Sequence, residues 1–450
     1  MQPLPEASDR QPDAAQAQRM RQTARDIFLF ALREASIEKA FRRHVHADRS
    51  VLRVGEDLYD LSGERRLFAV AIGKAAYTMM DCLHAQLGSR LTGIAVGATE
   101  AAEHRLGVQY FRGGHPVPNA ESWRAAEAVL RALKQQGPAA LVIFLLSGGG
   151  SALMEKPISD NISLDDLMAA YQALVLSGAT IVEINAIRKH LSAVKGGRLA
   201  RAAAPAQQVS ILVSDVPDNA PDALASGPTM PDSSTVEDCY RVAEKYDLAA
   251  QLPESSRCLF AEKGLEETPK AGDEAFARSR WWTVLSNAEV RQAAASAAAQ
   301  AGFAVTIDNS CDDLDYAAAA DQLLGRLREL RQGVSRVCLI SGGEVTVRVQ
   351  DGGRGGRNQQ FVLYCAQKIT GENITILSAG TDGIDGNSPA TGAVVDRTTV
   401  TRAGAKGLEV AAPLARFDAF PFFAALGDAI VTGPTGNNLR DLRVLLAYQE

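Results

Sequence analysis

Short apolar runs alternate with amphipathic helical patterns along the first half of the chain. Each run is apolar at consecutive positions, which is typical of strands that are buried on both faces of a parallel sheet. The helical patterns between the runs predict βαβ units and therefore an α/β fold. The predicted strands cover residues 67–72, 93–96, 141–146 and 209–213.

A second series of apolar runs follows a polar stretch at 253–273 that shows no clear periodicity. We place the domain boundary in this stretch, between residues 265 and 275. Val alternates with Thr and Arg at 345–349, which predicts a strand with one solvated face, so the second sheet is expected to be mixed. The predicted strands of this series cover residues 282–285, 303–307, 337–340, 345–349, 374–377 and 429–431.

These patterns predict an α/β protein of two domains. Residues 1–18 are polar and rich in Gln, Ala and Pro, which predicts a flexible arm before a first helix. We expect a Rossmann-like parallel sheet over 19–265 and a smaller mixed-sheet α/β domain over 275–450. Because ligands of such sheets bind at the carboxyl ends of the strands, we expect the site among the loops at 73–74, 147–151 and 214–218.

Composition excludes several classes of partner. The 450 residues carry a net charge of −6, which argues against a nucleic acid, whose binding depends on basic surface. The chain lacks both an apolar run long enough to span a membrane and a signal-like start, so we expect a cytoplasmic protein. Six scattered cysteines without metal-ligand spacing indicate reduced thiols rather than a disulfide framework or a zinc site.

Five glycine-rich segments follow predicted strands. Glycine lets the backbone approach an anion closely and direct N–H groups toward it. A single segment of this kind is better explained as a tight turn, but five together favour phosphate binding. Neither a P-loop nor a GxGxxG dinucleotide motif is present. The segments lie at 147–151, 195–198, 341–344, 352–359 and 433–438.

Cations and carboxylates also stand at predicted strand ends. Lys74 directly follows the strand 67–72, where an ammonium could neutralise a transferring phosphoryl group, and Arg357 could grip a phosphate or carboxylate. The alternative for either is an ordinary surface cation. Asp215 and Asp382 suit a magnesium ion or a base for a substrate hydroxyl, whereas turn formation is a serious competing explanation for Asp385.

The motifs resemble the class II glycerate kinases, a family also known as the hydroxypyruvate reductase group of tartrate degradation. The matches occur in the family's order over most of the chain. They are AIGKA (71–75), GHPVP (114–118), LSGGGSA (146–152), NAIRKHLS (185–192), KGGRLA (195–200), SDVP (214–217), ASGPT (225–229), GGRNQ (355–359), GTDG (380–383) and GPTG (433–436).

This resemblance implies a kinase that transfers a phosphoryl group from ATP to the 2-hydroxyl of D-glycerate with Mg²⁺. It also implies an N-terminal kinase domain and a C-terminal MOFRL domain, with the active site in the cleft between them. Lys74 and Arg357 match the family's proposed catalytic cations, and Asp215 is our third catalytic candidate. Asp215 and Asp382 are the metal candidates. The substrate- and nucleotide-binding candidates are His115, Ser147, Gly148, Gly149, Gly150, Ser151, Asn185, Arg188, Lys189, Lys195, Gly196, Gly197, Glu344, Asn358, Gln359, Thr381 and Asn437.

The working hypothesis places the ATP phosphates on the N–H groups of 147–151 and the glycerate carboxylate on Arg188, Lys189 or Lys195. The chain departs from the family's pattern at Gln360, Asn437 and residues 218–220, which affects metal or nucleotide contacts rather than the cations. One alternative is an NAD(P)H-dependent hydroxypyruvate reductase, against which the missing dinucleotide motif argues. Another is a non-catalytic nucleotide or sugar-phosphate sensor. Nucleotide preference and a homodimeric assembly stay open.

Overall fold

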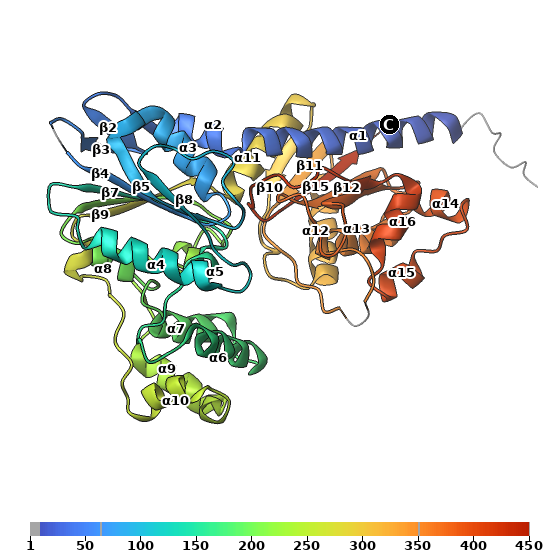
Figure 1. Cartoon of the computed structure of the whole chain (residues 1–450). Helices are drawn as coiled ribbons and strands as arrows, with labels where there is room; N and C mark the ends of the chain where they lie inside the picture. The colour runs from blue at the N-terminus through green and yellow to red at the C-terminus, as the bar shows by residue number, and fades with distance from the viewer. Residues whose placement is uncertain (1–9, 64, 350–351, 450) are drawn as a thin grey trace, which may run out of the picture. The chain divides into compact units, whose positions relative to one another are not determined.

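The computed structural model describes residues 10–63, 65–349 and 352–449 (Figure 1). The chain divides into two compact units. Ile37–Val284 form the middle unit, and Met1–Ser36 together with Leu285–Glu450 form the terminal unit. The bounds therefore differ from the expected 19–265 and 275–450, because the first helix belongs with the C-terminal part and the division falls after residue 284.

The first helix, α1 (Arg10–Glu34), occupies much of the segment expected to be a flexible arm. Residues 1–9 of that arm lie outside the described residues. Ala17, Ala24, Phe28 and Ala31 are fully buried on α1, at the spacing of one helix face. The structure thus differs from the expected flexible segment from Arg10 onward, because α1 begins there and Ala17 of this polar stretch is buried.

The middle unit is built on a six-stranded sheet of order β6-β5-β4-β7-β8-β9. The strands from β6 to β8 pair in parallel. Every residue of β4 and β7 is buried, which explains the continuous apolar runs. The strands are β4 (Leu67–Ile72), β5 (Leu91–Gly97), β6 (Val108–Arg112), β7 (Leu141–Ser147), β8 (Gln207–Val213) and β9 (Ser279–Leu285), so all four strands predicted in the first half are confirmed.

The order of the strands reverses between β4 and β7. From β4 the chain proceeds to β5 and β6 on one side, and it then returns to place β7 on the other side of β4. Ligands of open α/β sheets bind outside the carboxyl ends of the strands at such a switch point. β4 and β7 are parallel, and Ile72 at the end of β4 pairs with Leu146 near the end of β7. The loops that follow these two strands therefore lie side by side at the carboxyl ends of the strands.

Helices cover both faces of this sheet. Figure 1 shows α3 on one face and α4 and α8 on the other. Helix α4 begins with a capping box between Asn119 and Ser122 and buries Ala125, Val129 and Leu133 against the sheet. The helices are α2 (Ile37–His44), α3 (Ala76–Leu87), α4 (Ala120–Leu133), α5 (Gly150–Leu153) and α8 (Arg198–Ala203), and a small antiparallel sheet contains β1 (Val45–Ala47), β2 (Val51–Val54) and β3 (Asp57–Asp60).

A separate helical layer completes the middle unit. It has its own apolar cluster, in which Ile162, Leu167, Ile187 and Leu248 are fully buried. The layer contains α6 (Leu164–Leu176), α7 (Ile181–Leu191), α9 (Val236–Lys245) and α10 (Glu254–Ala261). Helix α10 lies within the polar stretch at 253–273, which shows no clear periodicity. The strand predicted at 282–285 is β9 of the first sheet rather than the start of the second.

The terminal unit contains a second six-stranded sheet, of order β10-β11-β15-β12-β13-β14. Only β10 and β11 pair in parallel, and the other pairs are antiparallel, so the predicted mixed sheet is confirmed. Its strands are β10 (Ala304–Ile307), β11 (Arg336–Ser341), β12 (Ile374–Gly380), β13 (Gly392–Asp396), β14 (Ala429–Ile430) and β15 (Asp441–Tyr448).

The strand predicted at 345–349 is wrong. Those residues make only an isolated bridge, between Thr346 and Asp315. The mixed character of the sheet comes instead from β15, which lies antiparallel between β11 and β12. All eight residues of β15 are buried, although three of them, Asp441, Arg443 and Tyr448, carry polar groups.

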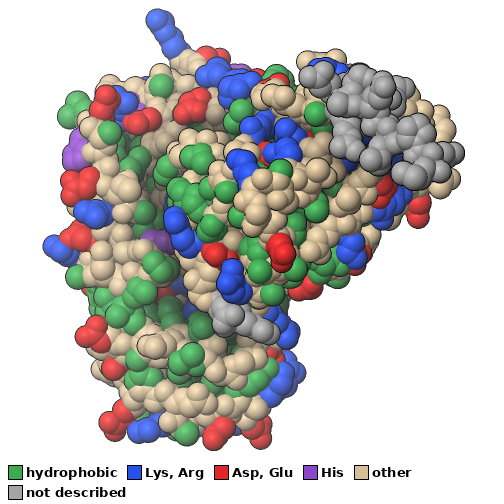
Figure 2. Space-filling view, turned by 90° about the vertical axis from the view of Figure 1, so that its right-hand side faces the viewer, with side chains coloured by type: hydrophobic (Ala, Val, Ile, Leu, Met, Phe, Trp, Pro, Cys, Tyr) green, Lys and Arg blue, Asp and Glu red, His purple; other side chains and the backbone are tan. Residues whose placement is uncertain are grey.

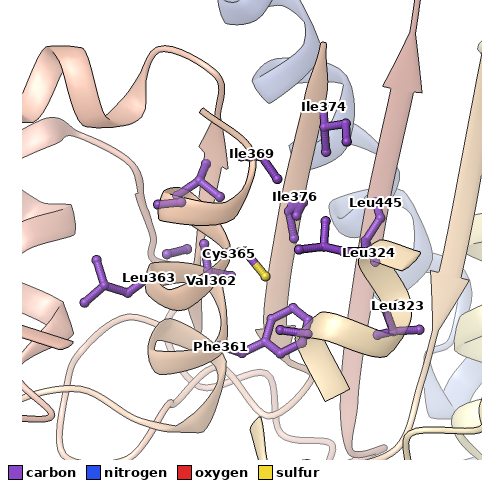
Figure 3. Packing of buried hydrophobic residues seen from close by; sticks show 14 of the residues in the cluster. Leu323, Leu324, Phe361, Val362, Leu363, Cys365, Ile369, Ile374, Ile376 and Leu445 are labelled. Atoms are coloured by element: carbon purple, nitrogen blue, oxygen red, sulfur yellow. The ribbon is translucent and has the colours of Figure 1, made fainter. Parts of the chain in front are cut away.

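Helices also cover both faces of the second sheet, with α1 and α11 on one face and α12 and α13 on the other (Figure 1). Figure 3 shows Phe361 and Cys365 of α13 and Leu323 of α12 packed against Ile376 and Leu445 of the strands. This core anchors α13, whose first turn carries several candidate residues. The helices are α11 (Asn287–Gln300), α12 (Tyr316–Leu330), α13 (Arg357–Lys368), α14 (Thr399–Gly404), α15 (Ala411–Ala415) and α16 (Ala419–Leu426).

On the face shown in Figure 2, Lys and Arg lie among Asp and Glu, and hydrophobic side chains are scattered between them. None of the helices in the described part of the chain combines the length and apolar character needed to cross a bilayer.

Candidate active site

Lys74 and the glycine-rich loop 148–151 lie together at the switch point of the first sheet. The Lys74 N–H donates to Gly148 O at 2.9 Å, and the Lys74 side chain passes beside Gly149. Ser147 is buried, and its hydroxyl accepts the Ala75 N–H at 3.0 Å, so it latches the two loops rather than facing a ligand. The Lys74 side chain itself is exposed.

Asp215 follows β8 and reaches the same edge. A Cβ placed on Gly148 would meet Asp215 Oδ2 at 1.8 Å, so the carboxylate lies directly against the bare backbone of the loop. Only glycine permits this approach. The structure therefore brings Asp215 beside the loop that follows β7, as its position after a strand predicts.

His115 completes this group of residues. Its ring lies 3.0 Å from the position of a Cβ on Gly149, on the same stretch of loop that Lys74 covers. Partial burial lowers the pKa of His115, and the Lys74 ammonium lowers it further. A neutral imidazole at neutral pH can both donate and accept a hydrogen bond beside the loop.

The loop 224–227 supports the glycine-rich loop from the other side. Ala225 and Ser226 have φ values of 51° and 61°, which non-glycine residues rarely adopt. Ser226 Oγ lies 2.7 Å from Ser151 Oγ, and the Ala225 methyl group faces Gly150. Backbone strain of this kind clusters at functional sites, where the surrounding structure holds it in place.

Lys189 and Lys195, two of the three cations proposed for the glycerate carboxylate, are buried and paired. Lys189 contacts Asp232 at 3.1 Å and Asp222 at 3.3 Å. Lys195 is 2% exposed and forms an ion pair with the fully buried Glu155. These two lysines are therefore committed to the interior of the middle unit.

Gly196 and Gly197 follow Lys195 with φ values of 56° and 81°. A Cβ on Gly197 would meet Met230 O and the Phe276 ring, each at 2.8 Å, so this turn faces protein rather than a ligand. Among the loops proposed to bind phosphate, the loop at 195–198 thus has the ordinary role of a tight turn.

Arg188 differs from both lysines. No carboxylate within the described residues pairs with its guanidinium, and its buried Nε lacks a hydrogen-bond partner there. The guanidinium carbon lies 5.0 Å from the centroid of the Tyr171 ring. Arg188 and Tyr171 line a cavity of about 670 Å³ with Pro116, Met168 and other residues of α6. Asn185, one turn earlier on α7, is half-buried.

Arg357 is the centre of a charged cluster in the terminal unit. Its Nε donates to Asp441 Oδ2 at 2.6 Å, and its Nη1 donates to Glu344 Oε2 at 2.9 Å. Burial opposes the charge, but the Asp441 and Glu344 carboxylates raise the pKa of Arg357 above its usual value. Burial also raises the pKa of Glu344. The predicted candidates Arg357 and Glu344 are thus brought into direct contact.

Asp385 caps the N-terminus of α13. Its carboxylate accepts the backbone N–H of Asn358 at 3.1 Å and of Gln359 at 2.9 Å, and both side-chain amides also donate to it. A helix N-terminus favours an anion, and here the protein supplies its own. The glycine-rich segment before α13 therefore accommodates Asp385, with a Gly356 Cβ position only 2.3 Å from Asp385 Oδ1, and the phosphate hypothesis gains no support there.

The burial of Asp385 predicts a pH-dependent stability. Burial raises the pKa of Asp385 to about 6, although the N–H donors of Gln359 and Asn358 oppose the rise. Because the pKa is higher in the folded state than in the unfolded state, this group's contribution to stability is present at low pH and is lost as the pH rises from about 4 to about 6. We expect the stability of wild type relative to Asp385→Asn to fall by about 2 to 3 kcal/mol over that range.

Urea unfolding of both proteins at pH 4.5 and pH 7.5 measures this difference. Comparison with Asp385→Asn removes the contribution of all other titrating groups. A stability difference that does not change with pH would show that Asp385 is ionised at both values.

Thr381 and Asn437 anchor loops. The Thr381 hydroxyl donates to Arg440 O at 2.8 Å and accepts the Leu439 N–H at 2.7 Å. Asn437 Nδ2 donates to Ala35 O at 3.2 Å. Gln360, the departure noted beside Arg357, donates to Leu414 O at 2.8 Å and is 2% exposed.

Asp382 lies beside Arg357 in the lining of a cavity of about 600 Å³ within the terminal unit. Its carboxylate accepts the Ile384 N–H at 3.1 Å, as in an Asx turn. Within the described residues, no three His, Cys, Asp or Glu side chains converge as a metal site. Magnesium is commonly held by one or two carboxylates together with substrate phosphates, so Asp215 and Asp382 each still fit that role.

Sequence reasoning missed four residues that shape these groups: Glu155, Tyr171, Asp441 and Arg443. Arg443 is fully buried and donates to Gly342 O at 2.8 Å, which holds the loop before Glu344. Asp441 and Arg443 lie two positions apart at the start of β15, and two charges on one face of an otherwise apolar run could have marked them. Glu155 and Tyr171 carry no comparable signal.

The comparisons with known proteins match two separate parts of the chain. Residues 23–261 match a family described as a domain of unknown function (DUF4147), and residues 337–441 match the MOFRL family. A D-glycerate 2-kinase of Thermotoga maritima is 36% identical over 393 residues, which is 84% of this chain and 89% of the relative. The chain belongs to the glycerate kinase family.

Two further matches carry a reductase name and a kinase name. A protein of Agrobacterium vitis with the provisional name hydroxypyruvate reductase is 38% identical, covering 85% of this chain and 87% of the relative. The crystal structure of a glycerate kinase from Thermotoga maritima aligns with a TM-score of 0.83 and 32% identity, covering 96% of this chain and 100% of the other. The expected α/β fold and family are thereby confirmed.

Proposed function

We propose that this protein is an ATP-dependent glycerate 2-kinase that phosphorylates D-glycerate to 2-phosphoglycerate. The observation that carries the proposal is the meeting of Lys74, Asp215 and the loop 148–151 at the switch point of the first sheet. Phosphoryl transfer requires positioning and charge neutralisation more than covalent chemistry, so a cation, a carboxylate and backbone donors suffice.

In this proposal the ATP phosphates lie on the loop that follows β7. The N–H groups of Ala152 and Leu153 already donate to Gly149 O at 3.2 Å and 3.3 Å. We therefore assign the phosphate oxygens to the N–H groups that precede them, from Gly148 to Ser151. The Lys74 ammonium beside Gly149 neutralises the charge on the transferring group. Asp215 orients the 2-hydroxyl of glycerate and accepts its proton as the new bond forms.

Arg188 is the cation that we assign to the glycerate carboxylate. It faces a cavity and has no carboxylate partner in the described part of the chain, whereas Lys189 and Lys195 are paired. A guanidinium can bind a carboxylate through two parallel hydrogen bonds. We also assign a hydrogen bond with the substrate to His115, whose ring lies beside Gly149.

Magnesium would be held by Asp215 or Asp382 together with nucleotide phosphates. When bound, it would neutralise phosphate charge during transfer. Arg357, with Glu344 and Asp441, is the second proposed catalytic cation, on the strength of its match to the family's motif.

A coupled assay tests the proposal directly. We expect ADP formation that requires D-glycerate, ATP and magnesium together, with 2-phosphoglycerate identified by phosphorus NMR. NADH oxidation by hydroxypyruvate is measured in parallel, because the Agrobacterium relative bears the reductase name. NADH consumption without ADP would replace the kinase by the reductase, and 3-phosphoglycerate would correct the position of transfer.

A further inference from the structure

A buried carboxylate lies between the loop 147–151 and Arg188. Glu155 is fully buried and accepts three side-chain hydrogen bonds. Ser192 Oγ donates to Oε1 at 2.5 Å, Tyr171 OH donates to Oε2 at 2.8 Å, and Lys195 Nζ forms an ion pair with Oε2. No step of the proposed reaction uses Glu155 or Tyr171.

One side of this hydrogen-bond network contacts the loop 147–151, which we propose binds phosphate and call the phosphate loop. Lys195 Nζ donates to the backbone oxygen of Ser151 at 2.9 Å, in the first turn of α5. Lys195 is 2% exposed, so it cannot exchange this contact for water. The position of the Glu155 carboxylate thus fixes the ammonium, and the ammonium fixes the end of the loop.

The other side of the network contacts Arg188. The Tyr171 ring lies 5.0 Å from the guanidinium carbon, and its hydroxyl is also 3.4 Å from the Arg188 backbone oxygen. Tyrosine is well suited to this position because the ring can stabilise the cation while the hydroxyl bonds the carboxylate. The same Glu155 oxygen, Oε2, therefore accepts hydrogen bonds from both Lys195 and Tyr171.

We propose that Glu155 and Tyr171 are positioning residues that couple binding at the phosphate loop to binding at Arg188. If the Glu155 carboxylate moved with Lys195, it would lose its hydrogen bond from Tyr171, and the reverse also holds. Such a loss is strongly unfavourable because a buried charge would be left without partners. Occupation of either site then favours the arrangement that the other ligand needs. This inference rests on the proposed kinase function.

The test measures the Kd of a non-hydrolysable ATP analogue by calorimetry with and without saturating D-glycerate. We expect glycerate to tighten nucleotide binding about fivefold in the wild type, as in a modest coupling between sites. Tyr171→Phe keeps the ring beside Arg188 but removes the bond to Glu155, so the ratio should fall to within about twofold of unity. Each ligand alone should still bind.

Tyr246→Phe is the matched control. Tyr246 OH donates to Glu183 at 3.0 Å in the same helical layer but contacts neither the loop nor Arg188, so its ratio should equal that of the wild type. Ser192→Ala, which removes another donor to Glu155, is the second variant and should also lower the ratio. Thermal melts establish that each variant is folded.

Coupling that survives in both Tyr171→Phe and Ser192→Ala would overturn the proposal, as would an absence of coupling in a wild type that turns over both substrates. If the wild type forms no ADP with glycerate, the proposed function itself fails. The two failures are therefore distinguishable.

Discussion

Replacement of Lys74 by alanine is expected to lower kcat by about 10³-fold, which is the loss typical of removing one preorganised charge from a transition state. The ammonium lies beside the glycine-rich loop, and no carboxylate within the described residues forms an ion pair with it. Its charge is thus available to the transferring phosphoryl group. Because the side chain is exposed, the free energy of unfolding should change by less than about 0.5 kcal/mol.

Lys134→Ala is the matched control for Lys74→Ala, since Lys134 is also exposed and follows the last turn of α4. It should retain the wild-type kcat and KM. Steady-state kinetics with ATP and D-glycerate, together with urea unfolding, separate catalysis from stability. A Lys74→Ala enzyme with near-normal kcat would remove Lys74 from the mechanism.

Much of the fold could be predicted because the central strands of the first sheet, β4 and β7, are continuous apolar runs. Periodicity cannot assign a strand to one sheet or another, however, and the strand predicted at 282–285 belongs to the first sheet rather than the second for that reason. The alternation of Val with Thr and Arg at 345–349 predicted a strand that is not present, because these valines line a cavity instead of a sheet face. Strand β15 was not predicted, because the charged residues Asp441 and Arg443 interrupt an otherwise apolar run.

The parts of the candidate site that could be predicted are the polar residues and glycines that directly follow a strand. Lys74, Asp215 and the loop after β7 meet because parallel strands deliver their loops to one edge. The side-chain pairings could not be predicted, because they depend on distant segments. The sequence favours Lys195 as a cation for the glycerate carboxylate, but in the fold it forms an ion pair with Glu155, which is 40 residues away in the chain. Glycine-rich loops were similarly ambiguous, since Gly356 accommodates a carboxylate of the protein itself.

Replacement of Arg357 should impair both stability and catalysis, and the two effects can be separated. A guanidinium has five N–H groups, and the contacts with Asp441 and Glu344 engage Nε once, Nη1 once and Nη2 twice. One Nη1 N–H remains outside these contacts, on a side chain that is 35% exposed. We expect Arg357→Ala to lower kcat by about 10³-fold, as is found for arginines that stabilise phosphoryl transfer.

The stability loss in Arg357→Ala comes from the carboxylates that remain. Asp441 is 1% exposed and would lose its bidentate partner. Breaking a buried pair from one side costs about 3–5 kcal/mol, and the partial exposure of Arg357 brings the expected value to about 2 kcal/mol. The double variant Arg357→Ala/Asp441→Asn removes the unpaired charge and should recover most of that stability without recovering kcat.

Arg354→Ala provides the matched control, because this exposed arginine precedes the same helix and its guanidinium carbon lies 4.9 Å from the centroid of the Phe420 ring. Its backbone N–H donates to Asp418 Oδ1 at 2.8 Å, and the alanine variant keeps that bond. It should leave kcat within about twofold and stability within about 0.5 kcal/mol of the wild type. If the double variant regained activity along with stability, Arg357 would serve only to neutralise Asp441 and Glu344. A catalytic role requires that the activity stay lost when the fold has been restored, since only then does the missing N–H, rather than the disturbed cluster, account for the defect.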